Sequence, residues 1–282
     1  MKLALVVQGG GTRGAYAAGV LDVLMKNGIR ADAVYGTSAG ALTGVNYVSE
    51  EPGRAKKVFL AMTKDRHFIN PLNFITKGSI FNFNELFFEL PKGPIPFDSK
   101  EFFGSKTEFY ACATSCLTGQ AVYFSKLDPE FWNGLAASAS LPLATKPTFV
   151  HGVPYLDGGL ADSIPVQKAL ADGADKVIVV LTRSEGYRKG KMKKKAYFLA
   201  KSMYHKYPEL LKAYKAAPDV YNAEMDFIDK AAKEGKIFAI YPSIPPVIGH
   251  AERNSRKVFA LINEGTDDAE KCLPLLKDYL SK

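Results

Sequence analysis

The N-terminal part of the sequence alternates between two kinds of segment, and this alternation limits the chain to one class of fold. Residues 2–8 (KLALVVQ) and 31–36 (ADAVYG) are short apolar runs bounded by turn residues, which predicts two buried strands. Residues 14–26 carry apolar side chains at helical spacing, and the dipeptide Asn27-Gly28 ends that helix. Residues 38–49 predict a second helix directly after the second strand. Strand, glycine loop, helix, strand, sharp turn and helix in this order indicate a layered α/β fold.

The rest of the chain continues the pattern with one interruption. Two adjoining strands are expected within 107–125, and DKVIVVLTR at 175–183 is the strongest strand signal. The interruption is 67–104, which is rich in Phe, Asn, Pro and Gly and lacks periodicity, so we expect an irregular insertion or a lid-like region. The remaining expected elements are a strand at 236–243 and helices at 51–65, at 130–140, from Pro165 onward, near 252–264 and at 267–281.

Composition narrows the class of protein. The chain has 282 residues, of which 47% are apolar and 23% charged, values that are ordinary for a folded soluble protein. Cys112, Cys116 and Cys272 form no CxxC pair, so neither a disulfide framework nor a structural zinc site is expected. The first apolar run is too short for a signal peptide, and no window reaches the roughly 20 apolar residues of a membrane span, so we expect a cytoplasmic protein. The net charge of +8 favours anionic partners.

The segment GTSAG at 36–40 has the form GxSxG and lies between a predicted strand and a predicted helix. That context is what a nucleophile elbow requires, because the tight turn lifts the Ser38 hydroxyl away from the backbone. Small residues at Gly36 and Gly40 prevent steric clashes in the turn. The alternative is a glycine-rich turn in which Ser38 only caps the following helix.

A serine nucleophile needs a base, and the sequence leaves two routes open. His250 lies late in the chain, where the order of an α/β-hydrolase triad would place its histidine. Asp157 lies at the end of a predicted strand and is followed by Gly158 and Gly159, which let the backbone turn sharply. The alternative for Asp157 is an ordinary Asp-Gly turn. The histidines of the chain are His67, His151, His205 and His250.

The segment GGGTRG at 9–14 supplies consecutive backbone N–H groups that could stabilise the oxyanion of an acyl-transfer reaction. It also fits the dinucleotide-binding spacing GxGxxG at Gly9, Gly11 and Gly14. That interpretation requires an acidic residue at the tip of the second strand, but Asp32 precedes the strand and GTSAG occupies its tip. A P-loop is excluded because no Gly-Lys-Ser/Thr follows.

Taken in order, GGGTRG at 9–14, GTSAG at 36–40 and DGG at 157–159 resemble the motifs of the patatin-like phospholipase family. AASASLPLATKP, ahead of DGG, is also typical of that family, and YPSIPPVIGHAERN looks like the C-terminal part of its bacterial members. The resemblance implies a three-layer α/β/α fold with a mostly parallel central sheet. The resemblance covers residues 3–170, which we expect to form the catalytic core. We expect one domain, 1–282, in which residues 171–282 complete the sheet and add the last helices.

The resemblance also implies a mechanism, in which Ser38 is the nucleophile and Asp157 the general base of a dyad that cleaves carboxylic esters of lipids. No metal or cofactor is implied. The alternatives are an α/β-hydrolase esterase that pairs Ser38 with His250, and a catalytically idle binding or regulatory protein on the same fold. The other implied site residues are Gly9, Gly10, Gly11, Thr12, Arg13 and Gly14 of the oxyanion hole, Gly36 and Gly40 of the elbow, and Gly158 and Gly159 of the base loop.

Two further segments bear on the substrate. Residues 67–91 are rich in phenylalanine and form either the wall or lid of an acyl-chain pocket or simply an insertion packed onto the core. Residues 188–215 are strongly basic with interleaved aromatic residues, which suits peripheral contact with an anionic membrane surface; the alternative is a packed helix with a solvated lysine face. No nucleic-acid-binding motif accompanies the run, so nucleic acid is not an expected partner. The apolar positions expected to share one helix face are Leu199, Met203, Tyr207, Leu210 and Tyr214.

Overall fold

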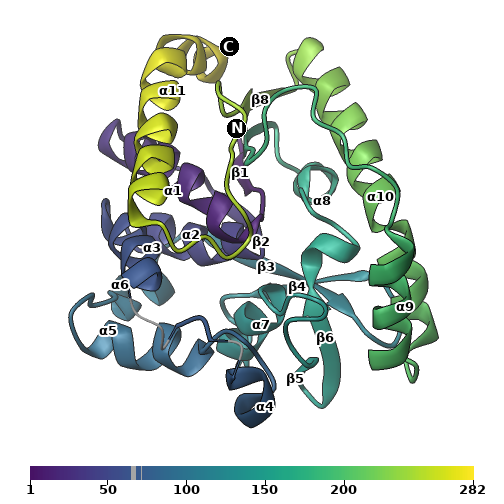
Figure 1. Ribbon diagram of the computed structural model, residues 1–282. Helices are drawn as coiled ribbons and strands as arrows, with labels where there is room; N and C mark the ends of the chain where they lie inside the picture. The colour runs from purple at the N-terminus through teal and green to yellow at the C-terminus, as the bar shows by residue number, and fades with distance from the viewer. Residues whose placement is uncertain (65–67, 71) are drawn as a thin grey trace.

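A central sheet runs through the protein, and helices cover both of its faces (Figure 1). The computed structural model describes residues 1–282 except 65–67 and 71. The strand order is β5-β6-β3-β2-β1-β7-β8, with β4 paired to β3 beside this path. The parallel strands are β1 (Leu3–Val7), β2 (Ala33–Thr37), β3 (Glu108–Ser115), β7 (Lys176–Val180) and β8 (Ile237–Ile240). The antiparallel part is β4 (Ala121–Ser125), β5 (Thr148–Val150) and β6 (Val153–Asp157).

Alternating side chains of the strands build two separate cores. Leu3, Leu5 and Val7 of β1 are buried under the helices of one face, whereas Ala4 and Val6 are buried under those of the other. Strands that are buried on both faces are apolar at every position. The sequence therefore predicts the strands but does not show which side chains point to which face. The expected three-layer α/β/α arrangement with a mostly parallel sheet is therefore confirmed. The helices of the first face are α1 (Ala15–Lys26), α2 (Ala39–Val48), α3 (Arg54–Lys64), α7 (Phe131–Ser138) and α11 (Ser255–Ser281); those of the second are α8 (Val166–Ala171) and α10 (Pro208–Lys233).

The expected irregular insertion consists of short helices joined by loops, at the lower left of Figure 1. Its apolar side chains form a small core of their own around Phe68 and Leu90, which packs against Val58 of α3. His67 lies outside the described residues, and a lid function for this insertion stays a prediction. The helical elements are α4 (Asn73–Lys77), the π-helical turn η2 (Glu85–Glu89), α5 (Leu90–Lys92) and α6 (Ser99–Gly104).

The prediction of two C-terminal helices is wrong, because α11 is continuous. The expected break fell near Gly265, a residue that the structure uses for close packing instead. A Cβ at Gly265 would lie 2.1 Å from the carbonyl oxygen of Tyr16, so the missing side chain lets α11 lie directly against α1. Pro274 lies inside α11 without ending it.

The expected single helix face within 188–215 is also wrong. The segment forms two helices, α9 (Lys194–Met203) and α10, which are separated at Tyr204–Tyr207. Leu210 and Tyr214 are buried in a core with Leu156, whereas Leu199 is exposed. Within the described part of the chain, none of these or the other helices has an apolar stretch sufficient to cross a bilayer.

Candidate active site

Ser38 occupies a strained turn between β2 and α2. Its backbone has φ 57° and ψ −129°, a left-handed conformation that is uncommon for a residue with a side chain. Its amide donates a hydrogen bond of 2.9 Å to Oγ of Ser138. Although Ser38 stands at the N-cap of α2, its hydroxyl makes no capping hydrogen bond. The hydroxyl is therefore not engaged as a simple cap.

The elbow depends on close backbone contact at Gly40. A Cβ there would lie 2.2 Å from the carbonyl oxygen of Val7, so any larger residue would push α2 away from β1. At Gly36, a Cβ would lie 2.5 Å from Cα of Ala41. Both glycines of the GxSxG segment thus have a steric reason to lack a side chain.

The sheet brings Asp157 toward Ser38, although the two residues are far apart in the sequence. Thr37 pairs with Cys112 of β3, and the next residue of β3, Ala113, pairs with Asp157 at the end of β6. The ends of β2 and β6 therefore pair with consecutive residues of β3. The antiparallel direction of β6 makes this possible, and sequence reasoning did not predict that pairing.

Hydrogen bonds hold the backbone of Asp157 and one oxygen of its carboxyl. Its amide donates to the carbonyl of Ser140 at 2.8 Å, and its carbonyl accepts from the Thr114 hydroxyl at 2.9 Å. Its carboxylate atom Oδ1 accepts from the amide of Gly159 at 2.8 Å. Gly158 lies against the carbonyl of Cys112, with no room for a side chain.

The environment of the Asp157 carboxyl suits a general base. The side chain is only 3% exposed, and this burial raises its pKa from 3.8 to about 6. The nearby Ser38 hydroxyl, the hydrogen bond from the Gly159 amide and the charge of Lys189 limit the rise of this pKa. The Oδ2 atom is buried and has no hydrogen-bond partner among the described residues. A carboxylate oxygen without a partner keeps its capacity to accept a hydrogen bond or a proton.

The glycine loop lies against the elbow. A Cβ at Gly9 would lie 2.8 Å from Cβ of Ser38, which measures how near the loop approaches the nucleophile. The amide of Thr12 donates to the carbonyl of His250, and the amide of Arg13 donates to the carbonyl of Gly10. These two amides are engaged in this conformation. Gly14 ends the 3-10 turn η1 (Gly11–Gly14), behind the loop.

The amides of Gly9, Gly10 and Gly11 make no hydrogen bond to any described residue. Gly10 and Gly11 both have positive φ, of 152° and 59°. The loop therefore offers a short run of unpaired N–H groups next to Ser38. The base of the loop is held by Thr182, whose hydroxyl donates to the carbonyl of Gly9 at 2.7 Å and whose amide donates to Oε1 of Gln8.

His250 supports the glycine loop. Its carbonyl accepts hydrogen bonds from both the amide and the hydroxyl of Thr12, at 2.9 and 3.0 Å. Its ring atom Nε2 lies 3.1 Å from a guanidinium nitrogen of Arg13 and must accept there, since Arg is a donor only. Burial and the charges of Arg13 and Arg183 lower its pKa to about 4.

The other described histidines lie elsewhere. The ring of His151 is exposed and hydrogen-bonds Asp128, and that of His205 is exposed and bonds the carbonyl of Ser202. Neither residue lines a cavity that contains Ser38. Among the described residues, no three His, Cys, Asp or Glu side chains gather as metal ligands would.

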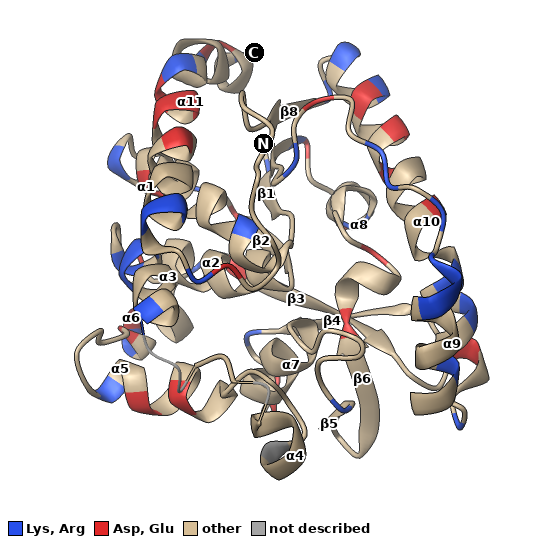
Figure 2. Cartoon of the chain, viewed as in Figure 1, with Lys and Arg blue, Asp and Glu red and all other residues tan. Residues whose placement is uncertain are grey.

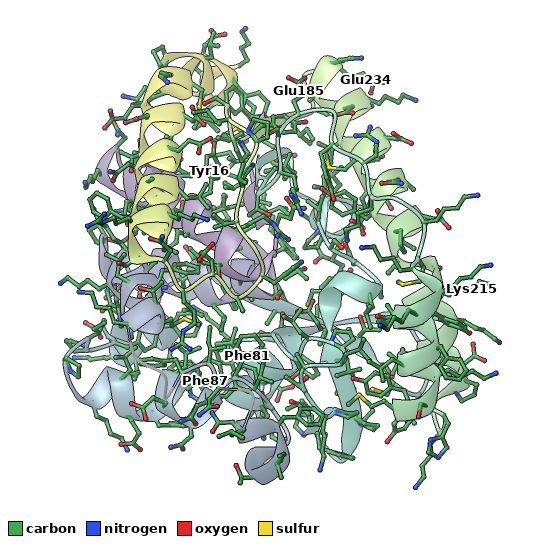
Figure 3. The ribbon with its side chains drawn as sticks, viewed as in Figure 1. Tyr16, Phe81, Phe87, Glu185, Lys215 and Glu234 are labelled. Atoms are coloured by element: carbon green, nitrogen blue, oxygen red, sulfur yellow. The ribbon has the colours of Figure 1, made fainter. Side chains whose placement is uncertain are left out.

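A narrow apolar cavity of about 90 Å³ opens at Ser38. The insertion contributes part of its wall, including Phe81 and Phe87, which Figure 3 labels in the lower left part of the molecule. Phe87 packs against Trp132 of α7, with ring centroids 5.8 Å apart. The apolar side chains that line the cavity include Leu42, Val45, Val58, Phe59, Met62, Phe68, Ile69, Phe81, Phe83, Phe87, Trp132 and Leu135.

Ser138 and Ser140 hold the backbone of the site, and the sequence did not identify them in advance. Both lie in AASASLPLATKP, a segment that the sequence identifies only as typical of the family that the motifs resemble. The hydroxyl of Ser138 fixes the backbone of Ser38, and the carbonyl of Ser140 fixes that of Asp157. One short segment thus holds both members of the pair. The only available signal was the run of small residues, which does not specify these partners.

Comparison with known protein families finds two models that match different parts of the chain. The family model described as "Patatin-like phospholipase" matches residues 5–170. A second model, described as a "Domain of unknown function (DUF6363)", matches residues 207–281.

Among individual proteins, the uncharacterized protein YjjU of Escherichia coli is 31% identical over 251 residues, which cover 86% of this chain and 69% of that protein. The lysophospholipase nte1 of Aspergillus niger is 30% identical over 186 residues, or 64% of this chain. This chain spans only 12% of that fungal enzyme. Among solved structures, VipD from Legionella pneumophila superposes with a TM-score of 0.46 at 12% identity, over 97% of this chain and 66% of that one.

Proposed function

This chain belongs to the patatin-like phospholipase family, and we propose from that premise that it is a serine hydrolase of lipid carboxylic esters. The observation that carries the proposal is the pairing of Ser38 with Asp157. The backbone of Ser38 is strained and its hydroxyl makes no capping hydrogen bond, and the buried Oδ2 atom of Asp157 lacks a partner among the described residues. The apolar cavity beside Ser38 suits an acyl chain. The lysophospholipase relatives support a lipid substrate.

In the proposed mechanism, the carboxylate of Asp157 accepts the hydroxyl proton of Ser38 while Oγ attacks the ester carbonyl carbon. The resulting oxyanion is stabilised by the unpaired amides of Gly9, Gly10 and Gly11, each worth roughly 3–4 kcal/mol of barrier. The carbon–oxygen bond to the alcohol then breaks, and Asp157 returns the proton to the departing oxygen. Water, deprotonated by the same carboxylate, cleaves the acyl-enzyme and restores Ser38.

The alternative pair of Ser38 and His250 has less support. The Nε2 atom of His250 is the acceptor of an Arg13 hydrogen bond, and its Nδ1 atom then carries the proton of the neutral ring. With its pKa lowered to about 4, the ring has little affinity for a further proton near neutral pH. We assign it to support of the glycine loop.

Ester hydrolysis by the purified chain tests the proposal. A lysophospholipid and a p-nitrophenyl ester should both be cleaved, and Ser38→Ala should reduce the rate roughly a thousandfold or more. A fluorophosphonate probe should modify Ser38 in the wild type. A catalytically idle protein would show neither turnover nor labelling, which would refute the proposal.

The basic segment supports peripheral contact with an anionic membrane. Figure 2 shows lysine residues gathered on α9, the helix on which Phe198 is 76% exposed. Exposed aromatic and basic side chains together suit the interface of an anionic bilayer. The full chain should therefore sediment with vesicles that contain phosphatidylglycerol. Phe198→Ser should weaken this binding, and equal sedimentation of both proteins would refute the contact.

A further inference from the structure

A second cavity adjoins the nucleophile, and its chemistry differs from that of the apolar cavity. It measures about 500 Å³, and both Ser38 and Asp157 lie in its wall. Five cationic side chains line it, whereas Asp157 is its sole carboxylate among the described residues. The cations are Arg13, Arg183, Lys189, Lys191 and Lys193.

The three innermost cations have no acidic partner. No described Asp or Glu lies within salt-bridge distance of Arg13, Arg183 or Lys189, and the latter two instead lie over the rings of Tyr187 and Tyr221, at 4.4 and 4.2 Å. Arg13 is only 6% exposed, yet its Nε atom has no hydrogen-bond partner in the described residues. Burial and the charge of Arg183 lower the pKa of Arg13 to about 10. Like charges thus converge on this cavity without compensation.

The neighbouring loop shows that this lack of partners is local. Arg188, adjacent to Lys189 in sequence, contacts both Asp226 and Asp229 at 2.7 Å. Arg188, which does not line the cavity, is therefore neutralised by acidic partners. Arg13, Arg183 and Lys189, which line the cavity, have no such acidic partners among the described residues.

Two carboxyls, Asp157 and Glu224, influence Lys189, but neither forms a salt bridge with it. Asp157 is the proposed base and must be free to take a proton. Glu224 lies beyond salt-bridge distance of Lys189, and burial together with the nearby charge of Asp162 raises its pKa. Uncompensated buried cations are costly, and a bound anion would relieve that cost.

We propose that Arg13, Arg183 and Lys189 bind the phosphoryl group of the substrate, and that the enzyme thereby selects lipid esters with an anionic, phosphate-bearing head group. The planar guanidinium groups suit phosphate oxygens, and the ammonium adds a point charge. A choline group is itself a cation, and it would lie near the like charges of the exposed Lys191 and Lys193 in the same wall. This inference rests on the proposed hydrolase function, since it places the ester of the same molecule at Ser38.

Binding to an inactive variant tests the site without relying on turnover. In a Ser38→Ala background, calorimetric titration should detect sn-glycerol 3-phosphate but not glycerol. Adding Arg183→Gln with Lys189→Met should weaken binding roughly tenfold or more, because two charge-assisted contacts are lost. The matched control, Lys100→Gln with Lys215→Gln, removes two exposed charges outside the cavity and should bind as the parent does. Equal binding by all three proteins, or none, would overturn the site.

Turnover of matched substrates identifies the source of the phosphate. The ratio of kcat/KM for lysophosphatidic acid to that for a monoacylglycerol of the same chain should exceed one and should fall roughly tenfold in Arg183→Gln/Lys189→Met. A ratio that the double variant does not change, together with tight binding of inorganic phosphate, would identify a site for free phosphate and overturn the head-group assignment. Binding of glycerol phosphate without hydrolysis of any ester would support the site and refute the hydrolase function.

Discussion

Asp157→Asn should make the stability of the protein less dependent on pH. In the wild type, burial raises the pKa of this carboxyl from 3.8 to about 6. The folded state therefore holds the proton more tightly than the unfolded state does. The stabilisation from protonated Asp157 is fully present below the unfolded pKa and is lost as the pH rises through the folded pKa. Asparagine does not titrate, so the variant has no such loss.

The size of the effect follows from the shift. Each pKa unit corresponds to about 1.4 kcal/mol, so a shift from 3.8 to about 6 corresponds to about 3 kcal/mol in total. Most of this, about 2 kcal/mol or slightly more, should disappear from the wild type between about pH 4 and pH 7.5. Any constant cost of placing an amide in the site cancels when the two pH values are compared.

Urea unfolding of both proteins at the two pH values measures the effect. The free energy of unfolding of the variant minus that of the wild type should increase with pH by about 2 kcal/mol. Other titrating groups, including Glu224, affect both proteins and drop out of the difference. A difference that stays constant or decreases with pH would show that the carboxyl is not held in its neutral form by burial, and would refute the reasoning.

Three further predictions concern the same region. The kcat/KM of ester hydrolysis should rise with pH through an apparent pKa of about 6, because the base acts only as a carboxylate; a flat profile would contradict this. Gly40→Ala should prevent stable folding or cost several kcal/mol, because its Cβ would lie 2.2 Å from the carbonyl of Val7, whereas Gly104→Ala, with open space around it, should melt like the wild type. Ser138→Ala should leave the buried Ser38 amide unpaired, lowering stability by about 1–3 kcal/mol and kcat more than it raises KM; unchanged kinetics would exclude this positioning role.

The sequence predicts the parallel part of the sheet well, because its strands are short apolar runs bounded by glycine. It also predicts that Ser38 follows a strand and precedes a helix. It does not predict that β6 runs antiparallel beside β3, since strand pairing depends on contacts between distant segments. The meeting of Ser38 and Asp157 therefore depends on a topology that only the structure supplies.

The supporting residues were harder to predict for a different reason. Ser138 acts through its hydroxyl and Ser140 through its backbone carbonyl, and neither role has a sequence pattern. The break expected between 264 and 267 falls at Gly265, whose lack of a side chain instead serves helix packing. The lysines and arginines around the second cavity come from η1 and from the segment after β7, so their convergence is likewise a product of the fold.

The central claim is that Asp157, and not His250, is the base that activates Ser38. The most direct measurement is the rate of hydrolysis of one lysophospholipid by Asp157→Asn and by His250→Ala, with Ser38→Ala as the blank and melting temperatures to confirm folding. The account predicts that Asp157→Asn falls to the level of the blank, a loss of roughly a thousandfold or more, while His250→Ala retains most of its turnover. Loss of turnover in His250→Ala with retention in Asp157→Asn would contradict it.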